Sequence, residues 1–308
     1  VTLCVSATGY GAAPIGAFNV GVAQGIAGLP LFSGMGFRWI LWIVLFTALA
    51  FYVYHYAEKV RKDPSKSIVK DIDYSDMEMS HEALNAKLSK RQIGVLLVFL
   101  SAISFLIFAA VKGGILGPWY TYSAIFFVMG ITAGIVAGYS ADKIVEEYVN
   151  GCKLLLYAGI VLGTAKAIAI VLEDGMIIDT LVNWLVIPLQ AFGGSSQSVA
   201  GIIMMFIQIL LNLIMPTNSG QALATMPILL PLGDLVGLNK QITVLAFQLG
   251  DGLTMMLFPT NGVLMAGLAL ARVPFDKWMK FAMPLAVIQI GIACIALVVA
   301  SFINYGPF

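Results

Sequence analysis

Two apolar segments of the chain are interrupted by the same tripeptide, Pro-Thr-Asn. The first interruption begins at Pro216 and is followed by Gln221, and the second runs from Pro259 to Gly262. Each offers hydroxyl and amide oxygens together with backbone carbonyls that a continuous helix would have paired. Oxygens of this kind can replace part of the hydration shell of a sodium ion. The helix after each break points its first N–H groups at the break, which favours a carboxylate.

Both interruptions lie in sequence that is apolar enough to be buried in lipid. The chain has 308 residues, of which 60% are hydrophobic and 11% charged, whereas a soluble domain has about 25% charged residues. A break within lipid is tolerated only where it faces protein or a water-filled cavity. Paired breaks therefore indicate the binding site of a transporter. The alternative is an ordinary turn between two spans and a proline kink.

Single polar residues within the spans are open to several interpretations. Asp251 could relay protons, pair with a cationic substrate or lie in the outer headgroup zone, since an acid inside a membrane is a functional candidate by default. Lys166 either extends its ammonium group to the membrane surface, forms a structural ion pair near Glu173, or has a functional role. Gln208, Asn212 and Gln248 are expected to form hydrogen bonds between helices.

The apolar pattern divides the chain into spans and loops. Unbroken spans are expected at 36–57, 93–111, 119–141, 154–172 and 281–303, an interfacial segment at 142–153, a surface segment at 173–198, and broken spans at 3–28, 199–236 and 241–270. With the polar segment 58–92 in the cytoplasm, thirteen Lys and Arg fall inside and only Arg38, Lys112 and Lys240 fall outside. This bias predicts a multi-pass protein of the inner (plasma) membrane with its C-terminus outside.

A weak internal repeat relates the two ends of the chain. Sliding 3–57 onto 245–299 superimposes Asn19 on Asn261 and aligns a broken helix followed by an unbroken span in each copy. The two copies would cross the membrane in opposite directions. The predicted fold is therefore an all-α polytopic membrane protein with an inverted repeat, a re-entrant hairpin and broken transmembrane helices.

The motifs around the breaks also carry a family resemblance. Met215–Gln221, Met226–Leu229, Ala246–Gly252, Pro259–Gly262 and Phe18–Gln24 are similar to the YfcC-like branch of the C4-dicarboxylate anaerobic carriers (DcuC type), within the ion transporter superfamily. The resemblance covers nearly the whole chain. It implies a homodimer with elevator-like movement of a transport domain against a scaffold. It also implies that a first hairpin would precede Val1, so that an N-terminal part is missing.

From these observations we expect four regions and one composite site. The regions are 1–62 and 199–308 (parts of the transport domain), 63–87 (cytoplasmic loop) and 88–198 (scaffold and dimerisation domain). The residues expected to bind substrate are Asn19, Asn218, Ser219, Gly220, Gln221, Asp251, Asn261 and Gly262. Those expected to bind the cation are Pro216, Thr217, Asn218, Ser219, Pro259, Thr260 and Asn261.

The function predicted from these sites is secondary active transport. The substrate is a small carboxylate metabolite, with a C4-dicarboxylate as first choice and arginine or ornithine antiport as the alternative, and the coupling ion is sodium or a proton. A structural or channel-like protein is the alternative from another class. Enzymatic catalysis is not expected, because the two His and three Cys are too few and too scattered for a catalytic or metal site. The near-neutral charge gives no basic field for nucleic acid, and no cofactor is expected.

Overall fold

The computed structural model describes residues 1–74, 88–112, 120–177 and 196–306, with the isolated positions 180, 184, 187 and 191. All regular structure in these ranges is helical, and it divides into two compact units, 1–72 with 155–308 and 73–154. Each unit is described by itself below. The first unit contains both predicted breaks.

The first part of the large unit is a broken helix followed by a long one. The helices are α1 (Thr2–Gly11), the short π-helix η1 (Ala17–Gly21), α2 (Val22–Ala27), α3 (Met35–Lys62) and the 3₁₀ turn η2 (Pro64–Lys66). The interruption between α1 and η1 contains Pro14, which cannot continue a helix. This arrangement confirms the predicted broken segment at 3–28 and the span at 36–57. The helix of that span continues to Lys62, so its last turn enters the segment predicted as polar loop.

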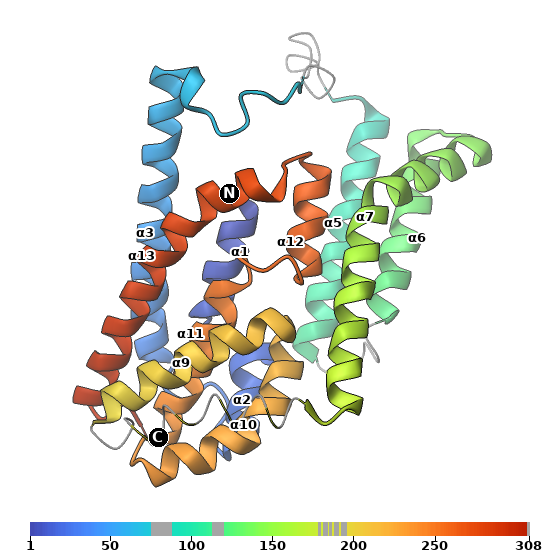
Figure 1. Ribbon diagram of the computed structural model, residues 1–308. Coiled ribbons are helices and arrows are strands. Elements are labelled where there is room, and N and C mark those ends of the chain that lie inside the picture. Colours follow the sequence, from blue (N-terminus) through green and yellow to red (C-terminus); the bar gives the residue numbers. More distant parts are fainter. Residues whose placement is uncertain are drawn as a thin grey trace. The chain divides into compact units, whose positions relative to one another are not determined.

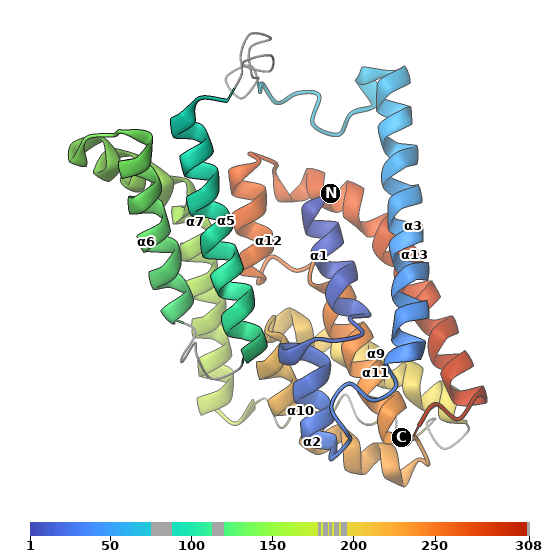
Figure 2. The ribbon, with the colours of Figure 1, turned by 180° about the vertical axis from the view of Figure 1, so that it is seen from behind.

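The second part of the large unit contains the two predicted interruptions. Its helices are α9 (Gln197–Ile214), α10 (Asn218–Leu235), α11 (Lys240–Thr254), α12 (Gly262–Leu270) and α13 (Phe275–Phe302). α11 is buried from Gln241 to Thr254 and packs against α9, α1, α10 and α13, so it forms the centre of the unit (Figures 1 and 2). A broken helix followed by a 28-residue helix thus occurs at both ends of the chain. The inverted relation between the two copies stays a prediction.

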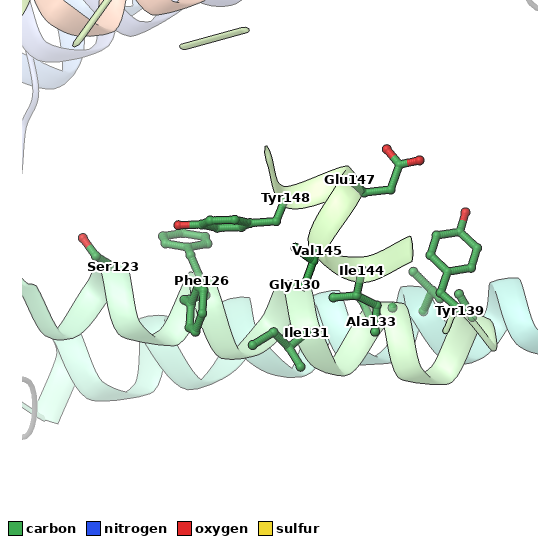
Figure 3. A pocket seen from close by; sticks show the side chains of 14 residues that line it. Ser123, Phe126, Gly130, Ile131, Ala133, Tyr139, Ile144, Val145, Glu147 and Tyr148 are labelled. Carbon is green, nitrogen blue, oxygen red and sulfur yellow. The ribbon is translucent and has the colours of Figure 1, made fainter. Parts of the chain in front are cut away.

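The small unit consists of α5 (Lys90–Lys112), α6 (Tyr120–Ala137) and the first part of α7 (Ala141–Asp174). α5 packs against α6, and a groove of about 870 Å³ lies over α6, with the start of α7 along its side (Figure 3). The groove is mainly apolar. Phe127 and Tyr148 meet edge to face on one of its walls, with ring centroids 5.5 Å apart.

One element differs from its prediction. The segments 142–153 and 154–172 were expected to be an interfacial stretch and a separate span, but α7 is one continuous 34-residue helix through both. The charges at its start suit a helix, because Lys143 pairs with Glu146 at 3.1 Å and with Glu147 at 2.8 Å, three and four residues further on. The predicted surface segment 173–198 lies largely outside the described residues.

Three of the described helices are long and apolar enough to cross a membrane: α3, α9 and α13. Several helices, among them α3, α5 and α6, carry large apolar side chains on their surface, Leu97, Phe127 and Phe51 among them. A surface of this kind is suited to lipid contact. Together with the composition, these helices make the chain an all-helical membrane protein.

Candidate functional site

The first break lies between α9 and α10. Pro216 has no N–H, so it ends the hydrogen-bond ladder of α9, and Thr217 occupies the N-cap position of α10. The Thr217 carbonyl accepts the first bond of the new helix from the Gln221 N–H at 2.8 Å. Asn218 lies in the first turn of α10 and is half-buried, as are its two successors, Ser219 and Gly220. A Cβ at Gly220 would collide with the Thr217 hydroxyl unless the threonine side chain rotated away.

The second break lies between α11 and α12. α11 ends at Thr254, and Asn261 caps α12 by accepting a hydrogen bond from the Leu264 N–H at 3.1 Å through its Oδ1. Asn261 is only 4% exposed, whereas Thr260 and Gly262 are half-buried and Pro259 is exposed. The break therefore presents partly open residues beside a helix N-terminus, as predicted.

The two breaks are in direct contact. The Thr260 hydroxyl donates a hydrogen bond to the carbonyl of Leu213, in the last turn of α9, at 2.9 Å. This carbonyl is free for the contact, because the Thr217 N–H, which would pair with it in a continuous helix, bonds to Met215 instead. Residues 47 positions apart in sequence therefore meet where both helices are interrupted. The approach of Asn218 to Asn261 across this junction stays a prediction.

Two other predicted site residues, Asn19 and Asp251, lie together in the interior. Asp251 on α11 is 0% exposed, so its side chain contacts protein and not a headgroup layer. Asn19 on η1 is 1% exposed, and its Nδ2 lies 3.5 Å from Asp251 Oδ2 and 3.3 Å from the carbonyl of Tyr10. Asn212 on α9 donates to the Asp251 carbonyl and to the Thr254 hydroxyl, both at 2.8 Å.

The glycines on either side of Asp251 explain how this helix comes so close to its neighbours. A Cβ at Gly250 would collide with α9 at Met205 and Gln208, and a Cβ at Gly252 would collide with the backbone of Gly11 on α1. The Gly-Asp-Gly sequence thus allows two helices to contact α11 closely on both sides of the carboxylate.

The side chain of Gln221 connects α10 to α9. It is fully buried, and its Nε2 donates to the carbonyl and to Oε1 of Gln208 on α9, at 2.8 and 2.6 Å. Gln208 in turn donates to Thr225 at 2.9 Å, so these side chains tie α10 to α9. Asn212 bonds to α11, and Gln248 accepts a hydrogen bond from Arg38 on α3. Gln208, Asn212 and Gln248, which were predicted to form interhelical hydrogen bonds, therefore do so. The side chains of Lys166 and Glu173 lie outside the described residues.

The sequence analysis missed a second polar cluster, around Arg38. This residue was counted among the outside loop charges, but it is 0% exposed on the first turn of α3. Its Nε donates to Gln248 at 2.9 Å, its Nη1 to the Ser33 carbonyl at 2.8 Å and its Nη2 to Gln241 at 3.2 Å. Gln241 and Gln248 lie two turns apart on α11, and that spacing in a buried helix could have indicated a polar partner.

The two clusters are linked to each other. Gln248 accepts from Arg38 and donates to the carbonyls of Tyr10 at 3.3 Å and Ala13 at 2.8 Å. The Tyr10 carbonyl also accepts from Asn19, which lies beside Asp251. A chain of hydrogen-bonding groups thus runs from a buried guanidinium to a buried carboxylate across α3, α11, α1 and η1.

Apolar helices, two helix breaks in contact and a buried polar chain between the broken helices are features of membrane transport proteins. The chain belongs to the C4-dicarboxylate anaerobic carrier family, whose model matches residues 1–302. This match confirms the resemblance seen in the motifs.

Two curated relatives are similar over most of the chain. The protein named "Putative basic amino acid antiporter YfcC" of Escherichia coli (strain K12) is 30% identical over 99% of this chain and 62% of its own length. An uncharacterized protein of Haemophilus influenzae (strain ATCC 51907 / DSM 11121 / KW20 / Rd) is 32% identical over 92% of this chain and 56% of its own length. The chain thus spans about three-fifths of the length of these relatives. No solved structure matches it.

Proposed function

We propose that the chain is part of a secondary active transporter that carries a small carboxylate metabolite together with a cation by elevator-type alternating access. The observation that supports this most is the hydrogen bond from Thr260 to Leu213, which joins the two breaks. The free N–H groups at the starts of α10 and α12 would bind the carboxylate. The oxygens of Thr217, Asn218, Ser219, Thr260 and Asn261 would hold a cation beside it.

The first candidate substrate is a C4-dicarboxylate, as the description of the family suggests. If the N-termini of α10 and α12 meet at the junction, they suit a molecule with two carboxylates, because each end can neutralise one of them. The second candidate is a basic amino acid, after the printed name of the relative from Escherichia coli. Such a substrate has one carboxylate for a helix N-terminus and a cationic side chain that needs a separate partner.

The test is uptake of labelled succinate and labelled arginine into liposomes that contain the full-length protein, with the Asn218→Ala and Asn261→Ala variants. Both variants should lose at least about nine-tenths of the uptake, because each removes an oxygen that is positioned to bind the ligand. The substrate whose uptake is lost identifies the class that is carried. Wild-type rates in both variants would show that the breaks are only kinks.

A matched control separates the binding role of Asn261 from its role as a helix cap. Asn239 caps α11 in the same way, by accepting from the Gln241 N–H at 2.9 Å. Loss of either cap should cost about 1 kcal/mol of stability. Asn239→Ala should therefore be destabilised as much as Asn261→Ala and still transport. Equal loss of transport in the two variants would assign the effect of Asn261→Ala to capping.

A further inference from the structure

Asp251 is a buried carboxylate without a cationic partner in the part of the chain that the structure describes. Among the described residues, no Lys, Arg or His lies within ion-pair distance of it. Its Oδ2 has only the long 3.5 Å contact with Asn19, and its Oδ1 has no hydrogen-bond partner in the described part of the chain. An ionised carboxylate is very unfavourable in such an environment unless a positive charge or a proton accompanies it.

The two asparagines beside Asp251 add further oxygens that lack partners. Asn19 and Asn212 use their amide N–H groups on Asp251, Tyr10 and Thr254, which leaves the Oδ1 of each asparagine buried and unpaired within the described residues. The Thr254 hydroxyl already donates to Gly250 at 2.6 Å, so it has no proton for them. All three unpaired atoms are acceptors, so each can take a cation, a proton or another hydrogen-bond donor.

The charged and titratable groups on the surrounding helices do not supply it. α9, α2 and η1 carry none, Asp234 on α10 is exposed, and Arg38 on α3 is committed to Gln248, Gln241 and Ser33. The remaining groups on α1 and α13 are Cys4, Tyr10, Asp276, Lys277, Lys280 and Cys294. Of these, Tyr10 contributes its backbone carbonyl to Asn19, Lys277 pairs with Asp71 at 3.3 Å, and Asp276 and Lys280 are exposed.

We propose that Asp251, Asn19 and Asn212 form a second cation site, for Na⁺ or a proton, that is separate from the oxygens of the two breaks and serves for coupling. The cluster is fully buried, which suits a bare cation and excludes the side chain of an amino-acid substrate in this conformation. The inference rests on the proposed function, since coupling presupposes transport.

The position of the site explains how an ion could influence the substrate. Asn212 lies in the last turn of α9, and its partner Thr254 is the last residue of α11. These are the two helices that end at the breaks. A cation bound between them would fix the relative positions of the two helix ends, and substrate affinity would then depend on the cation through a shared structural element.

Two fluxes measured on the full-length protein in liposomes test the proposal. One is exchange of labelled for unlabelled succinate or arginine at saturating concentration without an ion gradient, and the other is accumulation driven by a Na⁺ or a pH gradient. In Asp251→Asn, exchange should persist and accumulation should fall at least about fivefold, the lower end of usual coupling factors. Asp234→Asn, which changes an exposed acid on α10, should behave like the wild type.

The outcomes separate the two proposals. Accumulation in Asp251→Asn equal to that in Asp234→Asn would overturn the second site. A wild type that neither exchanges nor accumulates substrate would overturn the proposed function and, with it, this inference. The gradient that drives the wild type identifies the ion.

A binding measurement keeps the test independent of transport and of loss of folding. The melting temperature of the purified protein is compared in NaCl and choline chloride, and at two pH values, without substrate. A bound cation stabilises the folded protein, so the ion-dependent rise should persist in Asp234→Asn and shrink in Asp251→Asn, with Asp251→Glu restoring part of it. An equal rise in the wild type and in Asp251→Asn would contradict the site.

Discussion

At the scale of single residues, Arg38 is the clearest case of a charge that the interior of the protein requires. It is one of the largest fully buried side chains, and three of its nitrogens donate to groups on α11 and to the Ser33 carbonyl. Its guanidinium carbon also lies 5.7 Å from the ring centre of Tyr305. The planar fork of arginine suits several acceptors in fixed directions, which a lysine ammonium cannot reach together.

Truncation of this side chain should destabilise the protein strongly. Arg38→Ala leaves a large cavity and an unpaired Gln248 oxygen, so we expect a loss of about 3 kcal/mol or more, with a smaller loss for Arg38→Lys. Thermal unfolding in detergent measures both. Arg61→Ala is the control, because Arg61 is exposed and its one ion pair among the described residues is with Glu58, and it should change stability by less than about 1 kcal/mol. Equal melting of Arg38→Ala and Arg61→Ala would show that the buried cluster contributes little.

The sequence predicts the interhelical hydrogen bonds of the polar residues in α9 and α11 but not the buried position of Arg38. Gln208, Asn212 and Gln248 were recognised as interhelical, because a polar side chain in an apolar helix needs a partner. Arg38 was not, since a charge next to glycines at the start of a span is read as a loop residue. Only the fold shows that Gln241 and Gln248 accept from Arg38, and that Gln24 donates to the same Gln241 oxygen.

At the scale of elements, the contact between α1 and α11 depends on small residues. Gly252 meets the backbone of Gly11 so closely that a methyl group has no room there. The contact also holds the Tyr10 carbonyl near Gln248 and Asn19. Small residues at such crossings allow helix backbones to approach each other in membrane proteins.

The substitution Gly252→Ala should separate the two helices. The added methyl group collides with backbone atoms, which cannot rotate away, so we expect about 1–3 kcal/mol of destabilisation from overpacking and a loss of cation-driven accumulation. Gly9→Ala is the matched control, because a Cβ at Gly9 meets nothing within 4 Å and alanine favours a helix by up to about 1 kcal/mol. Thermal unfolding and uptake compare the two. A Gly252→Ala protein as stable and active as the Gly9→Ala protein would refute the close contact.

The hydrophobic pattern and the prolines predict most of the helices. The ends of the helices also depend on contacts between side chains, which the hydrophobic pattern does not contain. Pro216 and Pro259 marked both breaks, because proline removes a backbone donor. α7 was divided in two where its charged residues give way to apolar ones, although the spacing of Lys143, Glu146 and Glu147 places them on one face of a helix.

At the scale of the whole molecule, the two compact units 1–72 with 155–308 and 73–154 each pack mainly within themselves. The predicted division into a transport domain (1–62 and 199–308) and a scaffold (88–198) stays a prediction, as do the inverted repeat and the homodimer. Dimer formation depends on a second copy of the chain, and a transport domain is defined by its movement. The sequence gives information on both only through the residues at the surface. The proposed function depends on the claim that the two breaks line one cavity at their junction.

The most direct test of that claim is a cross-link between the breaks. Asn218→Cys and Asn261→Cys are combined in a full-length protein without its native cysteines, and a bifunctional maleimide that spans about 15 Å is added with and without succinate or arginine. If the breaks line one cavity near the middle of the membrane, the cross-link forms and bound substrate slows it. Two cysteines that react singly, without a cross-link and at rates that no substrate changes, would contradict the account.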